Sequence, residues 1–269
     1  MKPGAHYDVP SDVYHEWPYA SSTAIRALMR TSPAHAKVGL LDSNSPSLRL
    51  GTAVHAAILE PTKFDGMVRV EPKCDKRTKD GKALFESFEQ SLMPGQVRIS
   101  EEQFAVVRGI ERSVRASRTC TQLLERASVR EMSVVSEVEG VMCKCRCDAF
   151  GDGLVLDLKT TSGLASEEEF AKSVWNYGYA VQASFYRLVL DRAGIPMTSF
   201  AWIACETAEP YGVACYRIDA SVLDHFEPAI EEALRRWADC EHTQSWPAYP
   251  DELRPLTLPA WMTKQLEGS

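Results

Sequence analysis

The stretch Asp148-Ala-Phe-Gly-Asp-Gly-Leu-Val-Leu-Asp-Leu-Lys159 gives the strongest indication of the fold. Its second half alternates as a strand does, because successive side chains on a strand point to opposite faces of a sheet. Asp157 and Lys159 therefore share one face with Val155, and the leucines between them point into an apolar core. A carboxylate and an ammonium group on so apolar a strand are unfavourable to desolvate unless each has a partner. The pair therefore indicates a bound metal ion or phosphate.

A second strand is predicted directly upstream. Its side chains alternate between two faces, with Met142, Lys144, Arg146 and Asp148 on one and Cys143, Cys145 and Cys147 on the other. The segment Phe150-Gly-Asp-Gly153 is typical of a tight turn, so the two strands form a hairpin that brings Asp148 near Asp157. Two converging carboxylates and a lysine suit phosphodiester hydrolysis, in which carboxylates hold divalent ions. Taken alone, the pattern also fits a surface hairpin with an ordinary Asp–Lys ion pair.

A long helix is predicted after the hairpin. Ser166-Glu-Glu-Glu169 has the form of a capping box, and the helical pattern runs to Leu190 or Arg192, before Gly194 and Pro196. Gln182 and Tyr186 lie one turn apart on one face of this helix, with Tyr179 one turn before them, so they reach a common ligand. The alternative is the polar rim of a buried amphipathic helix, where the glutamine needs a hydrogen-bond partner.

Together these elements resemble the PD-(D/E)XK nuclease superfamily, in its branch with a Gln-x-x-x-Tyr motif. The resemblance rests on Asp148, Asp157-Leu-Lys159 and Gln182-Ala-Ser-Phe-Tyr186, and Gly51-Thr-Ala-Val-His55 is similar to the Gly-x-x-x-His element of that branch. It implies a restriction-endonuclease-like α/β (α+β) core, a mixed central sheet flanked by helices, with a helical N-terminal elaboration. The helix of His55 is expected to be capped by Thr52, with the histidine in its first turn, and to end before Pro61.

Within the superfamily the chain is most similar to the RecE-like recombination exonucleases of phages and prophages, represented by exodeoxyribonuclease VIII. Ala20–Ile25, Ser32-Pro-Ala-His35 and Pro72–Lys82 add to that resemblance, which spans about Tyr7 to Trp237, although Cys147 stands where the family usually has Pro or Ile. It implies 5′ to 3′ digestion of one strand of linear double-stranded DNA, which leaves 3′ single strands for a RecT-like annealing protein. It also implies a homo-oligomeric ring, a trimer or a tetramer.

The resemblance also implies roles for the residues of the site. The ligands of two Mg²⁺ or Mn²⁺ ions are implied to be His55, Asp148, Asp157 and the backbone carbonyl of Leu158. Lys159 orients the attacking water, and Gln182 and Tyr186 position a phosphate as hydrogen-bond donors. Glu131, at the start of the strand before the hairpin, is a further acidic candidate, but the alternation of that strand does not show whether it reaches the metal ions.

Several residues are candidates for binding DNA. Because the formal net charge is -7, a large nonspecific basic surface is excluded and DNA binding is expected to be local. The candidate contacts are Lys73, Lys76, Arg77, Lys79 and Lys82 in one loop, together with Ser21, Ser22 and Thr160. A second basic stripe at helical spacing comprises Arg108, Arg112, Arg115 and Arg118. The alternative for both basic groups is a solvated surface.

Composition indicates one substantial core in a chain of 269 residues with 45% hydrophobic content. A single exonuclease domain is expected over residues 1–245, with a helical part at about 1–128 and a catalytic core at about 129–240, followed by a tail at 246–269. The sequence contains no apolar run that would span a membrane, and residues 1–11 are too polar for a signal peptide. We therefore expect a cytoplasmic protein without a membrane partner.

Eight cysteines occur in the chain, and we expect buried thiols. Three of them lie on one strand face, too far apart for a compact tetrahedral site. An iron–sulfur cluster of the kind that some relatives carry is not expected, because beyond Trp237 the chain has only Cys240.

Three other functions stay open: an end-processing nuclease similar to Cas4, an endonuclease, or a non-catalytic module that binds DNA or recruits a partner. The expected order of elements is helices at Ser22–Arg30, Thr52–Leu59, Lys79–Leu92, Glu101–Ser117 and Thr121–Ala127, then strands at Glu131–Glu137, Val141–Ala149 and Leu154–Lys159, the Gln-Tyr helix, strands at Ser199–Glu206 and Val213–Asp219, and a helix at Ser221–Cys240.

Overall fold

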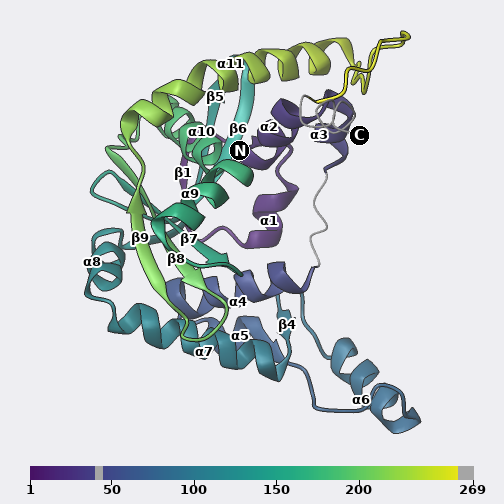
Figure 1. Ribbon diagram of the computed structural model, residues 1–269, viewed down its shortest axis with the longest axis vertical. Coiled ribbons are helices and arrows are strands. Elements are labelled where there is room, and N and C mark those ends of the chain that lie inside the picture. Colours follow the sequence, from purple (N-terminus) through teal and green to yellow (C-terminus); the bar gives the residue numbers. More distant parts are fainter. Residues whose placement is uncertain (40–44, 260–269) are drawn as a thin grey trace, which may run out of the picture.

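A mixed sheet forms the centre of the protein, for which a computed structural model describes residues 1–39 and 45–259 (Figure 1). Its seven strands run in the order β1-β5-β6-β7-β8-β9, and β2 pairs with β6 beside them; β3 and β4 form a separate two-stranded sheet. The strands are β1 (Gly4–His6), β2 (Ala20–Ser21), β3 (Val68–Val70), β4 (Val97–Ile99), β5 (Val129–Val138), β6 (Val141–Gly151), β7 (Leu154–Thr161), β8 (Ser199–Glu206) and β9 (Val213–Arg217).

Helices cover both faces of the sheet, as the sequence predicts. In Figure 1, α2, α10 and α11 lie above the sheet, and α4, α5 and α7 lie below it. The helices are α1 (Ser11–Glu16), α2 (Ser22–Arg30), α3 (Pro33–Val38), α4 (Pro46–Leu59), α5 (Phe64–Met67), α6 (Lys79–Gln90), α7 (Glu101–Ala116), α8 (Arg118–Arg126), α9 (Glu167–Asn176), α10 (Tyr179–Arg192) and α11 (Ala220–Thr243). The architecture is therefore the expected mixed α/β core with a helical N-terminal part.

Two apolar cores fill the two faces and confirm the predicted alternation. Val155 packs in the core beneath α10 and α11, and the thiols of β6 are buried there too. Leu154, Leu156 and Leu158 pack in the other core, against α4 and α7. All eight cysteines are free, and those of β6 are the buried thiols that the sequence predicts.

The predicted hairpin of β6 and β7 is present, but the two strands stay together only briefly. They pair over Ala149↔Leu156, Phe150↔Val155 and Gly151↔Leu154, and farther along β6 the neighbour is β2, with Ala20 opposite Cys143. β7 instead continues beside β8, in parallel. Counted back from the turn, β6 and β7 therefore separate at Asp148, and the gap between them is open to side chains.

The predicted helix over 166–192 is wrong in one respect, because it is broken into α9 and α10. Gly178 adopts a left-handed conformation, φ 67°, between them. Two arginines of α2 stabilise the break: Arg26 donates a hydrogen bond to the carbonyl of Tyr177, and Arg30 donates to those of Trp175 and Asn176. Because these contacts come from about 150 residues away in the chain, local periodicity cannot reveal the break. The predicted capping box is also incomplete, since the Ser166 side chain makes no capping hydrogen bond.

The helix of His55 begins earlier than predicted. Ser45 caps it, Pro46 occupies its first turn, and Thr52 lies inside it with its hydroxyl bonded to the Leu48 carbonyl. His55 therefore lies in the third turn of α4, although the helix does end before Pro61 as expected. The predicted cap at Thr52 is therefore wrong, because Ser45 and Pro46 start the helix and a single glycine, Gly51, is tolerated inside it.

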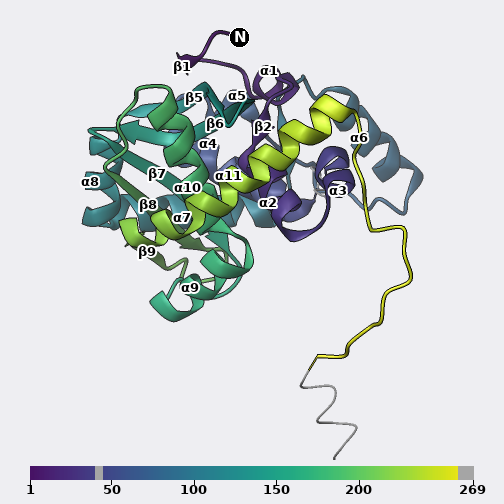
Figure 2. The same cartoon turned by 90° about the horizontal axis from the view of Figure 1, so that it is seen from above.

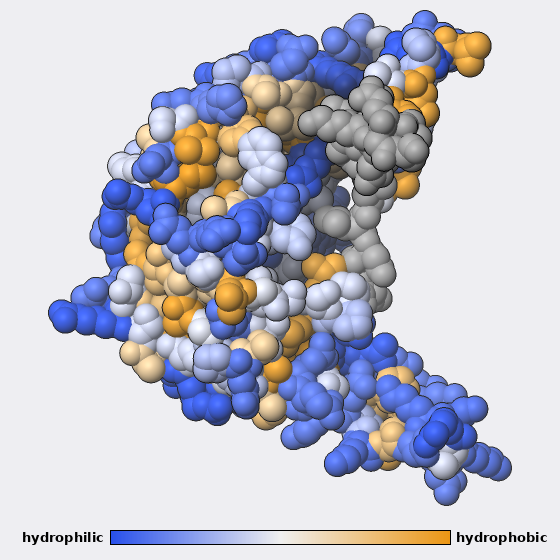
Figure 3. Space-filling model, viewed as in Figure 1, coloured by the Kyte–Doolittle hydropathy of each residue, from blue (hydrophilic) through white to orange (hydrophobic). Residues whose placement is uncertain are grey.

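An arm projects from the body between β3 and β4, neither of which the sequence analysis predicted. It comprises residues 71–96 with helix α6, and it extends away from the sheet in Figure 1. Its surface is mostly hydrophilic in Figure 3.

At the other end of the chain, Pro247 and Tyr249 contact α3, and the tail then leads away from the body up to residue 259 (Figure 2). The remainder of the predicted tail, 260–269, lies outside the described residues. Within the described part of the chain, no helix is long and apolar enough to cross a membrane.

Candidate active site

The gap between β6 and β7 collects the charged side chains that the sequence singles out. At its start, the Asp148 carboxylate accepts a hydrogen bond from the backbone N–H of Leu158, with 2.7 Å between Oδ2 and N. The side chain thus satisfies a strand amide that has lost its ladder partner, because β6 has already turned away. The position of the Asp148 carboxylate therefore follows from the separation of β6 and β7.

A group of three ligand-type side chains forms on one side of this gap. One donor atom from each of His55, Glu131 and Asp148 lies within 4.8 Å of the others. The ring of His55 bridges further, with Nε2 2.9 Å from the Leu158 carbonyl oxygen and Nδ1 3.5 Å from Asp148 Oδ2. Glu131 joins because its backbone has a left-handed φ of 51°, a local distortion of β5 that strand alternation could not predict.

Glu131 also interacts electrostatically with Asp148 and His55. Burial and the nearby Asp148 carboxylate raise the pKa of Glu131 to about 7, while His55 and Arg146 oppose that increase. Two carboxylates this close repel each other when both are ionised, unless a proton or a cation lies between them. The arrangement is therefore suited to a cation.

The second half of the site is the ion pair of β7. Asp157 is 2% exposed, and its Oδ2 lies 2.6 Å from Lys159 Nζ. Its other oxygen, Oδ1, accepts a hydrogen bond of 2.9 Å from the Gln182 amide on α10. The same amide donates to the Tyr186 hydroxyl at 3.3 Å, so the Gln-x-x-x-Tyr motif contacts Asp157. Gln182 and Tyr186, which were predicted to position a phosphate, therefore orient the Asp157 carboxylate in this structure.

The charges of this pair influence each other. Burial raises the pKa of the Asp157 carboxyl, and the Lys159 ammonium opposes that shift. Burial alone would lower the pKa of Lys159, but the carboxylates of Asp157 and Asp148 raise it above its ordinary value. The ammonium also lies 4.7 Å from the centre of the Tyr179 ring, a favourable cation–π contact. Lys159 is therefore held as a cation beside the gap.

The donor set fits a hard divalent cation. Carboxylate and carbonyl oxygens are the ligands that Mg²⁺ and Mn²⁺ prefer, with imidazole as an added nitrogen donor. Asp157 is buried beside this group, and its Oδ2 already lies 2.6 Å from the Lys159 ammonium. His55, Glu131, Asp148 and the Leu158 carbonyl are the groups positioned to hold such an ion, with Asp157 beside them.

The predicted DNA contacts lie in different settings. Ser21 uses its hydroxyl to cap α2, and Ser22 is buried, so both serve the fold. Thr160 follows Lys159 and lines a cavity next to it. The five basic candidates between Lys73 and Lys82 are exposed on the arm, away from the ligand group.

The predicted arginine stripe is only partly one surface. Arg108 and Arg115 both pair with Glu111 on α7, and Arg118 belongs to the next helix, α8. These local ion pairs favour the alternative of a solvated helix face.

Sequence reasoning missed Arg26 and Arg30 as residues of this region. Their positions at i and i+4 on α2 signal a shared helix face, but not what that face contacts. Tyr177 was also missed, because it was expected within a continuous helix.

Fold and site together define the class of the protein: a PD-(D/E)XK-like nuclease fold, with the acidic strand pair, the lysine and the Gln-Tyr helix meeting at the point where the sheet diverges. The chain belongs to the family described as "PDDEXK-like domain of unknown function (DUF3799)", whose family model matches residues 21–255. The superfamily expected from the sequence is thereby confirmed.

Two solved structures are similar to the chain to different degrees. A "Putative exonuclease" from Eubacterium rectale is 14% identical and superposes with a TM-score of 0.64, covering 98% of this chain and 100% of that one. A "phage related exonuclease" from Haemophilus somnus 129PT is 13% identical over 84% of this chain and 96% of that one, with a TM-score of only 0.35. No protein with a curated description matches the chain.

Proposed function

We propose that the protein is a metal-dependent exodeoxyribonuclease that digests one strand of linear double-stranded DNA in the 5′ to 3′ direction. The observation that carries the proposal is the convergence of His55, Glu131 and Asp148 beside the Asp157–Lys159 pair. The exonuclease description of the Eubacterium rectale protein with the same fold supports it. The polarity rests on the resemblance to RecE-like enzymes.

Two Mg²⁺ or Mn²⁺ ions are the proposed cofactors, held by His55, Glu131, Asp148, Asp157 and the Leu158 carbonyl. Such ions polarise a phosphate and lower the pKa of a bound water. Lys159 hydrogen-bonds the attacking water and offsets negative charge on the phosphate in the transition state. Gln182 fixes the Asp157 carboxylate by its 2.9 Å hydrogen bond, and Tyr186 accepts from the same amide, so both act as positioning residues.

DNA ends are the proposed substrate, and the exposed basic residues of the arm supply contacts to the phosphate backbone. A homo-oligomeric ring and a RecT-like annealing partner complete the proposal. Both depend on the family resemblance.

Linear duplex DNA labelled at either its 5′ or its 3′ end tests the activity, with a covalently closed circle in parallel. In the presence of Mg²⁺ we expect early release of the 5′ label as short products and an intact circle. Asp148→Asn should abolish this cleavage. Asp152→Asn is the matched control: it makes the same change in the turn of the same hairpin, where φ is 47° and asparagine is tolerated.

Each other outcome revises the proposal differently. Early loss of the 3′ label would reverse the polarity, and cutting of the circle would indicate an endonuclease. If Asp148→Asn cleaved as well as Asp152→Asn, the assigned centre would be wrong. If neither Mg²⁺ nor Mn²⁺ supported cleavage, a DNA-binding module without catalysis would become the better explanation.

A further inference from the structure

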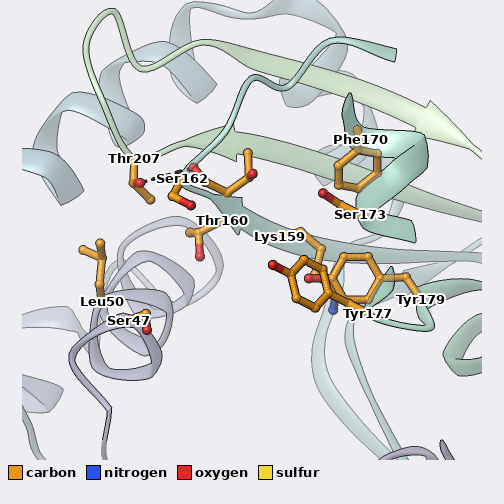
Figure 4. Close-up of a pocket in the computed structure, with 11 residues that line it drawn as sticks. Ser47, Leu50, Lys159, Thr160, Ser162, Phe170, Ser173, Tyr177, Tyr179 and Thr207 are labelled. Carbon is orange, nitrogen blue, oxygen red and sulfur yellow. Dashed lines mark hydrogen bonds between the residues drawn. The ribbon is translucent and has the colours of Figure 1, made fainter. Parts of the chain in front are cut away.

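A cavity of about 270 Å³ opens directly beside Lys159. Figure 4 shows it between the first turns of α4, which contribute Ser47 and Leu50, and the corner where α9 meets α10. Its floor is the end of β7, from Lys159 to Ser162. The cavity is close to the lower end of the range, about 300–1,000 Å³, of ordinary small-ligand pockets. It has room for one nucleotide but not for a duplex.

The lining of this cavity is neutral and hydroxyl-rich. Among the described residues that line it, Lys159 is the single charged side chain, and that charge is paired with Asp157. The other polar lining groups are the hydroxyls of Ser47, Thr160, Thr161, Ser162, Ser173 and Thr207. Hydroxyls both donate and accept hydrogen bonds, so they suit the sugar and phosphate oxygens of a single strand.

Two tyrosines form one wall. The rings of Tyr177 and Tyr179 lie 5.7 Å apart with 30° between their planes, and Tyr179 carries the Lys159 ammonium 4.7 Å above its ring. Tyr177 is 59% exposed, unusual for so large an aromatic side chain. In Figure 4 the two rings lie side by side next to Lys159. The Tyr179 ring thus contacts the lysine, while the Tyr177 ring is largely exposed.

The backbone that presents Tyr177 is fixed. The left-handed Gly178 makes the corner, and Arg26 and Arg30 hold the three carbonyls before it. A side chain on a backbone restrained in this way loses little freedom when a ligand binds. The corner therefore displays an exposed aromatic ring at a constant distance from the proposed catalytic lysine.

We infer that this cavity is a subsite for one unpaired nucleotide of the strand being cut, with its base stacked on Tyr177 and its sugar and phosphate against the hydroxyl lining. The inference rests on the proposed function, because it identifies which part of the DNA lies beside Lys159. Every base has a π-face, so stacking of this kind tolerates any sequence. A nuclease that digests a strand to its end requires that tolerance.

A duplex with one abasic nucleotide in the digested strand tests the inference, with cleavage followed one nucleotide at a time on end-labelled DNA. The wild-type protein should slow about 5- to 150-fold when the abasic nucleotide reaches the subsite, as expected for loss of one base–aromatic stack. Tyr177→Ala should be slower by a similar factor on normal DNA, with no additional pause at the abasic position. Tyr177→Phe keeps the aromatic ring and should therefore retain the pause at the abasic position. Trp175→Ala, which removes another exposed aromatic from the same corner but outside this cavity, should also behave as wild type.

Independent, additive losses from the abasic nucleotide and from Tyr177→Ala would overturn the inference, as would a wild-type enzyme that passes the abasic position without a pause. A second measurement separates this failure from failure of the proposed function. Binding of a fluorescently labelled single-stranded oligonucleotide, normal or abasic, is measured in EDTA, where no cleavage occurs. Preference for the normal strand in the wild type and its loss in Tyr177→Ala would support the subsite even if no DNA were cut; equal affinities in the wild type would refute it.

Discussion

The candidate catalytic centre and the arm both gather charge, but they hold it in opposite ways. At the centre, partners come from distant parts of the chain: His55 contacts Leu158, 103 positions away, and Gln182 contacts Asp157, 25 positions away. In the arm, partners are close in sequence, since Arg77 pairs with Asp75 and Lys76 pairs with Glu71. The Arg77–Asp75 pair is exposed, whereas Asp157 and Gln182 are buried.

This difference separates two kinds of function. Charges that are buried and fixed by distant partners act at one point, so their removal should change the rate of a chemical step. Charges that are exposed and locally paired contribute little to stability and act mainly through long-range attraction. We therefore expect centre variants to change cleavage and arm variants to change affinity and its salt dependence.

Lys159→Met should lower the cleavage rate by about 10²–10³-fold, because one charged donor to the transition state is lost. Binding of DNA should persist. Single-turnover digestion of 5′-labelled duplex measures the rate, and circular dichroism verifies folding. Lys172→Met, at an exposed lysine of α9 paired with Glu168 and Glu169, is the control and should cleave normally. A Lys159→Met protein with full activity would contradict the assignment.

The sequence predicts one half of this centre better than the other. Period-two alternation in the hairpin correctly assigned Val155 and the leucines of β7 to opposite cores and brought Asp148 near Asp157. That success has a physical reason, because a slip of one residue would have turned Asp157 and Lys159 toward the apolar core against α4 and α7. The roles of Asp148 and Asp157 as metal ligands stay predictions.

The rest of the centre depends on features that local pattern does not encode. Glu131 reaches the ligand group through a left-handed φ, and the corner at Gly178 depends on hydrogen bonds from Arg26 and Arg30. The start of α4 is different, because Ser45-Pro46 is a local helix-start signal that the predicted cap at Thr52 overlooked. Long-range contacts hold the corner at Gly178, and tertiary structure overrides propensity at such points.

Gln182→Leu should reduce the cleavage rate by about 10- to 100-fold, the size usually found when the partner of a metal-site carboxylate is removed. The cause is loss of the 2.9 Å hydrogen bond to Asp157, which fixes that carboxylate. Ser184→Ala is the matched control on the same helix, since it removes a buried hydrogen bond to the Leu223 carbonyl. It should lower the free energy of unfolding by about 1 kcal/mol and leave the rate unchanged. Equal rate losses in the two variants would reduce Gln182 to a structural role.

The double variant Lys79→Ala/Lys82→Ala should weaken DNA binding without changing the single-turnover rate at saturating protein. If both exposed lysines contact phosphates, the slope of log affinity against log salt should become shallower by roughly 2. Fluorescence anisotropy over a series of salt concentrations measures the slope. Arg112→Ala, an exposed arginine of α7, is the control and should leave it unchanged. An unchanged slope in the double variant would make the arm a solvated surface.

The smallest effects should come from one kind of change made in both regions. Ser45 caps α4, which carries His55, and Thr78 caps α6 in the arm. Replacing Ser45 by Ala should lower the free energy of unfolding by about 1 kcal/mol and the melting temperature by about 2–4 °C, because α4 packs in a core. The same replacement at Thr78 should leave the melting temperature unchanged and instead accelerate amide hydrogen exchange in α6, which opens locally. Equal shifts in melting temperature would mean that the arm unfolds together with the centre. The two regions would then differ in how their charges are paired and buried, and not in local stability.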